Sequence, residues 1–156
     1  MLAIPLYVGA QTSDKPSQTQ TSNKKSSVDY FATDRAKKAR QNWILNCQGC
    51  HKIDGTGRPE KGLPNLTGEV ARFLHTPGGR EYLSRVPGVT NASINDEDLT
   101  DLINWLLVRF DPEHIPQGHQ PYTVQEVSQG RAHPLSIGAA DKRADLLLAL
   151  SKNTKN

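Results

Sequence analysis

Both cysteines of the 156-residue chain lie in one short stretch, NCQGCHK, which runs from residue 46 to residue 52. Cys47 and Cys50 are three positions apart, and His51 follows directly. This pattern is typical of covalent haem attachment, in which each thiol adds to one vinyl group of the porphyrin and the histidine lies under the iron. A chain that must enclose a haem at this point is restricted to few folds.

Other cysteine chemistries fit the stretch less well. A structural zinc site or an iron–sulfur cluster needs about four ligands, and the chain has no second cysteine pair. A redox-active CxxC disulfide needs no histidine behind it and usually lies within a βαβ pattern, which this sequence lacks. We therefore expect one haem c, bound through Cys47 and Cys50, with His51 as the proximal iron ligand.

Composition and charge exclude several classes of function. The formal net charge is +3, well below the dense Lys/Arg loading of nucleic-acid binders, so no nucleic-acid partner is expected. No apolar run is long enough to cross a membrane as a helix, so no membrane span is expected in this chain. No paired carboxylates, phosphate-binding loop or Ser/His/Asp pattern supports a hydrolase or a transferase.

The first 33 residues are interpreted as lying outside the folded part. Residues 1–10 end in a short apolar run followed by small residues, which resembles the end of an export signal, although a basic start is missing. Residues 11–33 are mostly Ser, Thr, Gln and Lys, and such a segment cannot bury enough apolar surface to offset its chain entropy. We interpret residues 11–33 as a disordered tether.

Helical patterns dominate the rest of the chain. The strongest predicted helix starts after Asn95, a good N-cap that is followed by three acidic residues. Its apolar stripe comprises Leu99, Leu102, Ile103, Leu106 and Phe110, flanked by Trp105. Further helices are predicted from about residue 34 to the cysteines, over about 69–74, 80–85 and 141–151, and briefly after residue 123.

The first of these helices is expected to be capped by Asp34. Its candidate inward residues are Ala36, Ala39, Trp43 and Leu45. A basic cluster on its outer side comprises Arg35, Lys37, Lys38 and Arg40, and it is interpreted first as a solvated helix face and second as a docking surface for an acidic partner. The segment at 123–126 has capping-box spacing between Thr123 and Glu126.

Residues 34–110 resemble a class I c-type cytochrome domain. Ala39, eight residues before Cys47, falls where that family prefers Gly or Ala, and Trp43 falls where it prefers an aromatic residue. The stretch GLPNLTG matches its Gly/Pro loop, and LTDLINWLL matches its last helix, with Trp105 near the usual aromatic position. The resemblance implies a small, mainly α-helical domain wrapped around one covalent haem, with few or no strands.

The resemblance also implies a haem environment. Pro64 is the candidate whose backbone carbonyl accepts a hydrogen bond from the Nδ1–H of His51, a contact that fixes the imidazole ring and its tautomer. The other residues expected around the haem are Leu66, Trp43, Phe73 and Tyr82.

The second axial ligand is the open question of this sequence. The family usually takes it from a methionine in the loop before the last helix, but the only methionine here is Met1. His75 is the preferred candidate, because in the family this stretch of the chain covers the distal side of the haem. His114 and His119, on a Pro-rich arm, are the next candidates. An iron with no distal protein ligand is the main alternative.

These observations predict an exported cytochrome of four segments: 1–10, 11–33, a cytochrome c domain over 34–111, and a Pro-rich arm with a helical extension over 112–156. We expect a periplasmic protein that passes single electrons between redox proteins, with a periplasmic dehydrogenase as a plausible donor. A bound subunit of a larger redox complex is another hypothesis. An open iron would instead bind a small gas or peroxide, as in a sensor or an enzyme.

Overall fold

The computed structural model describes residues 31–153, so the predicted signal remnant and nearly all of the predicted tether lie outside the described residues. Within this range the protein is helical, with one isolated β-bridge between Arg58 and Leu63, which confirms the mainly α prediction. In chain order the helices are α2 (Asp34–Asn46), α3 (Gln48–His51), η1 (Pro59–Lys61), η2 (Ala71–His75), α4 (Gly79–Arg85), α5 (Pro87–Thr90), α6 (Asp96–Phe110), η3 (Pro112–His114), α7 (Val124–Ala132) and α8 (Ala139–Asn153), where η marks a 3₁₀ helix.

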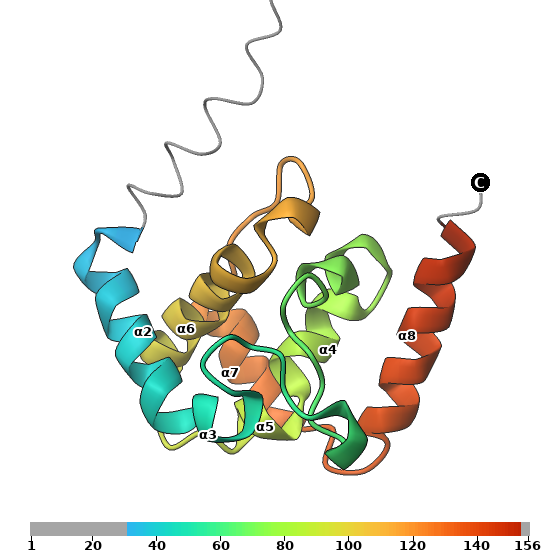
Figure 1. Cartoon of the computed structure of the whole chain (residues 1–156), viewed down its shortest axis with the longest axis horizontal. Coiled ribbons are helices and arrows are strands. Elements are labelled where there is room, and N and C mark those ends of the chain that lie inside the picture. Colours follow the sequence, from blue (N-terminus) through green and yellow to red (C-terminus); the bar gives the residue numbers. More distant parts are fainter. Residues whose placement is uncertain (1–30, 154–156) are drawn as a thin grey trace, which may run out of the picture.

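The helices are arranged with α2 along one edge of the molecule and α8 along the opposite edge (Figure 1). Between these edges, α6 packs on α2, and α7 packs on both α4 and α6. The helix α8 contacts η2 and α4. The chain after residue 111 is therefore packed on the predicted cytochrome c domain through two helices.

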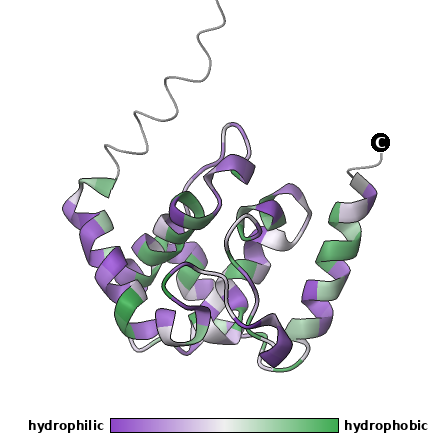
Figure 2. Ribbon diagram, in the orientation of Figure 1, coloured by the Kyte–Doolittle hydropathy of each residue, from purple (hydrophilic) through white to green (hydrophobic). Residues whose placement is uncertain are grey.

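The contact between α2 and α6 depends on small residues. Ala36 and Ala39 are each 1% exposed and face α6, so the two helix backbones can approach closely. Two cations of the basic cluster, Arg35 and Lys38, form ion pairs with carboxylates of α6, the latter at 2.7 Å from Asp98. Figure 2 shows the polar character of α2 beside the more apolar α6.

These ion pairs change the interpretation of the basic cluster. Arg35 pairs with Asp101, Lys38 with Asp98, and Lys37 with Asp34 at 2.9 Å within its own helix. Exposed pairs of this kind add little to stability, because water and salt screen them. They do, however, neutralise most of the positive charge that the cluster could offer to a partner.

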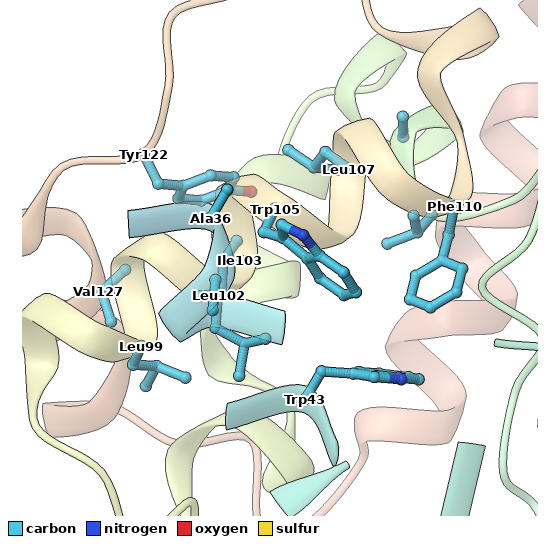
Figure 3. Close-up of a cluster of buried hydrophobic side chains, with 13 residues drawn as sticks. Ala36, Trp43, Leu99, Leu102, Ile103, Trp105, Leu107, Phe110, Tyr122 and Val127 are labelled. Atoms are coloured by element: carbon cyan, nitrogen blue, oxygen red, sulfur yellow. The ribbon is translucent and has the colours of Figure 1, made fainter. Parts of the chain in front are cut away.

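The core collects the aromatic residues of α2 and α6. Trp43 lies 4.8 Å from Phe110 and 6.3 Å from Trp105 between ring centroids, and Trp105 meets Phe110 edge-on at 5.7 Å. Figure 3 shows these three rings together with the buried aliphatic residues of α6. Within the predicted stripe of α6, only Leu106 is half-buried, and the other members are buried.

Two local predictions for α2 were wrong. Leu45 is 79% exposed, because it is on the side of α2 opposite to the face that meets α6. The N-cap is Thr33 rather than Asp34: the Thr33 hydroxyl accepts a hydrogen bond from the backbone N–H of Ala36, and Asp34 lies in the first turn.

Other helix ends follow local signals. Asn95 caps α6 by accepting a 2.8 Å hydrogen bond from the N–H of Asp98, and the predicted capping box at Thr123 and Glu126 is present at the start of α7. The helix predicted over 69–74 is instead the 3₁₀ helix η2. The short helix α5 was not predicted, and it begins at Pro87, since proline is well tolerated in the first turn of a helix.

We expect the substitution Ala39→Leu to lower the free energy of unfolding by about 1–3 kcal/mol, because the added side chain overpacks the contact between α2 and α6. Ala144→Leu is the matched control: Ala144 is exposed on α8, and leucine and alanine have similar helix propensities, so a change within about 0.5 kcal/mol is expected. Urea unfolding of both variants measures the difference. Equal losses would show that the contact is not tight.

Candidate functional site

One helical turn carries the three residues of the predicted haem motif. Cys47 ends α2 by donating its backbone N–H to the carbonyl of Trp43 at 2.9 Å. Cys50 and His51 then donate their backbone N–H groups to the carbonyl of Cys47, at 3.1 and 3.0 Å. Both cysteines are free thiols; Cys50 is exposed and Cys47 is half-buried. Two thiols and one imidazole therefore project from a single turn of backbone.

The imidazole of His51 is oriented by the loop that follows it. Its Nδ1 lies 3.1 Å from the backbone oxygen of Pro64, which is the pair that the family resemblance implies. Because a carbonyl only accepts hydrogen bonds, Nδ1 carries the proton and donates it. The lone pair of the neutral ring then lies on Nε2, the atom that is left for a metal.

Burial changes the protonation of these groups. Desolvation lowers the pKa of His51, although its hydrogen bond to Pro64 acts in the opposite direction, so the ring is neutral at neutral pH. Burial also raises the pKa of the Cys47 thiol to about 11, and the neighbouring Cys50 adds to this effect. A neutral imidazole is the form that binds iron.

The loop backbone holds Pro64 close to His51. Gly57 donates its N–H to the carbonyl of His51 at 2.9 Å, and the bridge between Arg58 and Leu63 closes the loop behind it. Gly57 has a φ of +65°, and a Cβ at this position would lie only 2.4 Å from the Pro64 oxygen. Only glycine combines this backbone conformation with this close approach.

Trp43 joins this turn to the core. Its ring lies 6.1 Å from the imidazole of His51, and its buried indole Nε1 has no hydrogen-bond partner among the described residues. A buried N–H without a partner costs free energy, so a hydrogen-bond acceptor is expected next to this group. Half-buried apolar side chains pack against the same core from several loops and helices: Leu66, Leu74, Leu83, Val89, Ala92, Ile94 and Leu106.

The distal candidate His75 lies at the exposed end of η2. Its Nε2 lies 2.8 Å from the backbone oxygen of His114 and donates to it. The Nδ1 of His114 is 2.5 Å from Asp111, a buried carboxylate whose second oxygen accepts the N–H of Ala71 at 2.8 Å. The structure thus brings His75 and His114 together, and the hydrogen bond between them links η2 to the Pro-rich arm.

Two residues of the expected haem environment lie in a different cluster. Phe73 and Tyr82 pack on each other at 5.3 Å and share a cluster with Leu146 of α8, whereas Trp43 and Leu66 belong to the core of α2 and α6. Burial raises the pKa of Tyr82, which Arg143 partly opposes, so the phenol stays protonated at neutral pH. The structure does not bring Phe73 and Tyr82 together with the Cys47–His51 turn.

The remaining histidines, the distal candidate His119 and the surface residue His133, lie in the C-terminal extension. Burial lowers the pKa of His119, with a further lowering from Arg80. The backbone oxygen of His133 accepts a 2.7 Å hydrogen bond from Arg85, and its ring Nδ1 lies 3.0 Å from the carbonyl of Gln129. Neither residue joins the His51 loop.

The residues present fit a covalently bound haem. Two unpaired thiols and a neutral imidazole with its Nε2 available share one turn, and half-buried apolar side chains surround the core beside it. The buried indole N–H of Trp43 adds a donor without a protein acceptor among the described residues. No group of three or more His, Cys, Asp or Glu side chains in residues 31–153 could hold a separate metal ion.

Comparison with known proteins also indicates a c-type cytochrome. The chain is 32% identical over 108 residues to a protein named cytochrome c-552 from Thermus thermophilus, a match that covers 58% of this chain and 82% of the relative. A second cytochrome c-552, from a named strain of the same species, is also 32% identical, with 72% of its length covered. The chain belongs to the class I c-type cytochromes. No family model and no solved structure matches it.

As a c-type cytochrome, the protein binds haem c covalently and functions in electron transfer. No helix in the described part of the chain is long and apolar enough to span a membrane. The loop between α4 and α6, where this family usually carries an axial methionine, has none.

We expect Gly57→Ala to destabilise the protein by several kcal/mol and to lower the fraction of chains that carry covalent haem, since the Cβ would push the Pro64 carbonyl away from His51. Gly62→Ala is the control, because Gly62 also has a positive φ, +74°, but its Cβ would meet nothing within 4 Å. Gly62→Ala should lower the free energy of unfolding only by the strain of a left-handed backbone, about 1–2 kcal/mol. Urea unfolding and haem staining of denaturing gels measure both effects, and equal losses would contradict the crowding argument.

Proposed function

We propose that the protein carries single electrons between redox proteins in the periplasm, with Cys47 and Cys50 as the thioether residues and His51 as the proximal ligand. The observation that supports this most directly is the turn in which both thiols and the oriented imidazole occur together. Bound iron would supply the chemistry by cycling between Fe(III) and Fe(II). The chain supplies attachment, an imidazole with a fixed tautomer, and an apolar surrounding.

Three residues complete the proposed proximal side. The Pro64 carbonyl holds the His51 ring and raises the basicity of Nε2. Leu66 and Trp43 supply apolar surface next to the motif, and the unpaired indole N–H of Trp43 is available to an acceptor on the cofactor.

For the distal side we propose that the second ligand is not methionine and that His75 is the candidate. In the described conformation its Nε2 is bonded to the His114 carbonyl. Ligation through Nε2 therefore requires this bond to break, whereas ligation through Nδ1 would keep it.

The same bond supports a second candidate function, a haem protein with an open distal position that binds a small gas or peroxide. His75 is exposed and already has a hydrogen-bond partner, and the half-buried side chains from the loop before α6 are aliphatic. Aliphatic groups offer no ligand to iron. The two functions differ in whether the imidazole of His75 binds iron.

The proposed location and partners rest on the family and on the sequence. Covalent attachment at CxxCH in bacteria takes place after export, and residues 1–10 resemble the end of an export signal. We propose the periplasm as the location and a periplasmic dehydrogenase, or a larger redox complex, as the partner. Because most of the basic cluster on α2 is paired, a partner that docks there would meet little net charge.

The attachment residues are tested by substitution. Cys47→Ser and Cys50→Ser should each leave at most one thioether, and the double variant should carry no haem that survives denaturation. A pyridine haemochrome spectrum counts the remaining bonds from the band position. An unchanged spectrum in either single variant would contradict the assignment.

The distal ligand is tested by the visible spectrum of the ferrous protein with and without CO. If His75 binds the iron, the spectrum is six-coordinate and low-spin, resists CO, and becomes high-spin in His75→Ala. His114→Ala is the matched control, because it removes the neighbouring imidazole but keeps the backbone oxygen that His75 contacts. A high-spin wild-type spectrum that shifts readily with CO would instead support the open site.

A redox titration provides an independent check. Ligation by two histidines lowers the reduction potential relative to His/Met ligation of similar burial. We therefore expect a potential below that of His/Met cytochromes if His75 is the ligand. A high value would count against His75.

A further inference from the structure

The residue Arg131 of α7 connects the C-terminal extension to the loop before α6. Its guanidinium donates to the carbonyl of Ala92 at 2.9 Å and to that of Ile94 at 2.8 Å. It also forms an ion pair with Asp96, in the first turn of α6, at 2.7 Å. One side chain thus satisfies two backbone carbonyls and one carboxylate, as the forked geometry of arginine allows.

The helix that carries Arg131 is firmly placed. Val127 is fully buried, and Gly130 lies so close to α4 that a Cβ would be 2.5 Å from the carbonyl oxygen of Ser84. The capping box of Thr123 and Glu126 fixes the start of the helix. Because α7 cannot shift easily, the guanidinium acts on the loop from a fixed point.

The segment that Arg131 holds is residues 86–95, named here the distal loop. Val89, Ala92 and Ile94 of this loop are half-buried and pack against the core of α2 and α6. Its internal hydrogen bonds form the single turn of α5, such as that from the Asn91 N–H to the Pro87 carbonyl at 3.0 Å. One turn of helix has little stability of its own, so the loop depends on contacts from outside.

We propose that Arg131 is a positioning residue that holds the distal loop against the core of α2 and α6, on which Cys47 also packs, and that it would so limit access of exogenous ligands to a bound iron. This inference rests on the proposed haem site. In this protein the loop has no methionine with which to bind iron, and the guanidinium of the extension supplies an anchor in its place. The aliphatic side chains of the loop then stay against the core, where they would keep water and small ligands from a bound haem.

The chain offers a closely matched control. Arg80 of α4 has the same set of partners, two backbone carbonyls (Gln120 and Pro121) and one carboxylate (Glu126), and it also joins the extension to the rest of the protein. It holds the Pro-rich arm, however, and not the distal loop. Arg80 also stacks on the ring of Tyr122, 4.1 Å from its centroid, so Arg80→Gln removes at least as many contacts as Arg131→Gln, at a different place.

Hydrogen exchange of the haem-loaded protein tests the anchor. In Arg131→Gln, the amides of residues 89–92 should exchange about tenfold faster than in the wild type, which corresponds to about 1.4 kcal/mol. In Arg80→Gln, the increase should fall on residues 119–126 and spare the distal loop. An unchanged rate over 89–92 in Arg131→Gln, or the same increase in both variants, would overturn the proposal.

Binding of CO to the ferrous protein tests the effect on access. All variants are compared in a His75→Ala background, because ligation by His75 would itself block CO. In that background Arg131→Gln should bind CO about tenfold faster than the protein with Arg131 and than Arg80→Gln. Arg131→Lys should fall between wild type and Arg131→Gln, since an ammonium keeps the pairing with Asp96 but cannot hold both carbonyls in a fork. If Arg131→Gln binds CO no faster than Arg80→Gln, the access role is wrong. That result leaves the electron-transfer proposal intact, because covalent haem and a reversible potential test the latter separately.

Discussion

The close packing of α2 on α6 determines where the haem motif lies. Ala36 and Ala39 allow the two helices to approach, and Trp43 then reaches Phe110 and Trp105 of α6. Because the turn from Cys47 to His51 continues directly from the end of α2, its position follows from this contact. A larger residue at the small positions would move the thiols and the imidazole together. The apolar burial of the core therefore also positions the chemistry of the site.

The two sides of the site are held by different kinds of contact. On the proximal side, His51, Gly57 and Pro64 are close in sequence, and backbone hydrogen bonds within one loop fix their geometry. The loop before α6 is held instead by a residue far along the chain, Arg131, whose guanidinium donates to two of its backbone carbonyls. The residues after 111 pack on the earlier helices, so under the proposal for Arg131 the extension supports the site. That residues 34–111 form a domain of their own stays a prediction.

The sequence predicted the features that depend on local chemistry. The caps at Asn95 and Thr123 and the stripe of α6 are signals that neighbouring residues create, and the structure contains them. Features that depend on distant partners were missed. Leu45 was expected to face inward, but no element of the described chain covers that side of α2. The pairing of Phe73 with Tyr82 needs α8, and the contacts of Arg131 need the fold itself, so no local pattern could indicate either.

If His75 is the distal ligand, as proposed, the iron and the His114 carbonyl compete for its Nε2. His75 in the described conformation donates to a carbonyl that is itself held in place, since His114 bonds to the buried carboxylate of Asp111, and that carboxylate also accepts the N–H at the start of η2. Moving His75 onto iron through Nε2 would therefore disturb a connected set of bonds that is anchored on a buried group. The bond from His75 to the His114 carbonyl is itself exposed, so water can replace either partner, whereas the bond from the Ala71 N–H to Asp111 is buried and costly to break. Under that proposal, the strength of the hydrogen bond from His75 to the His114 carbonyl affects whether the iron is six-coordinate or has an open distal position.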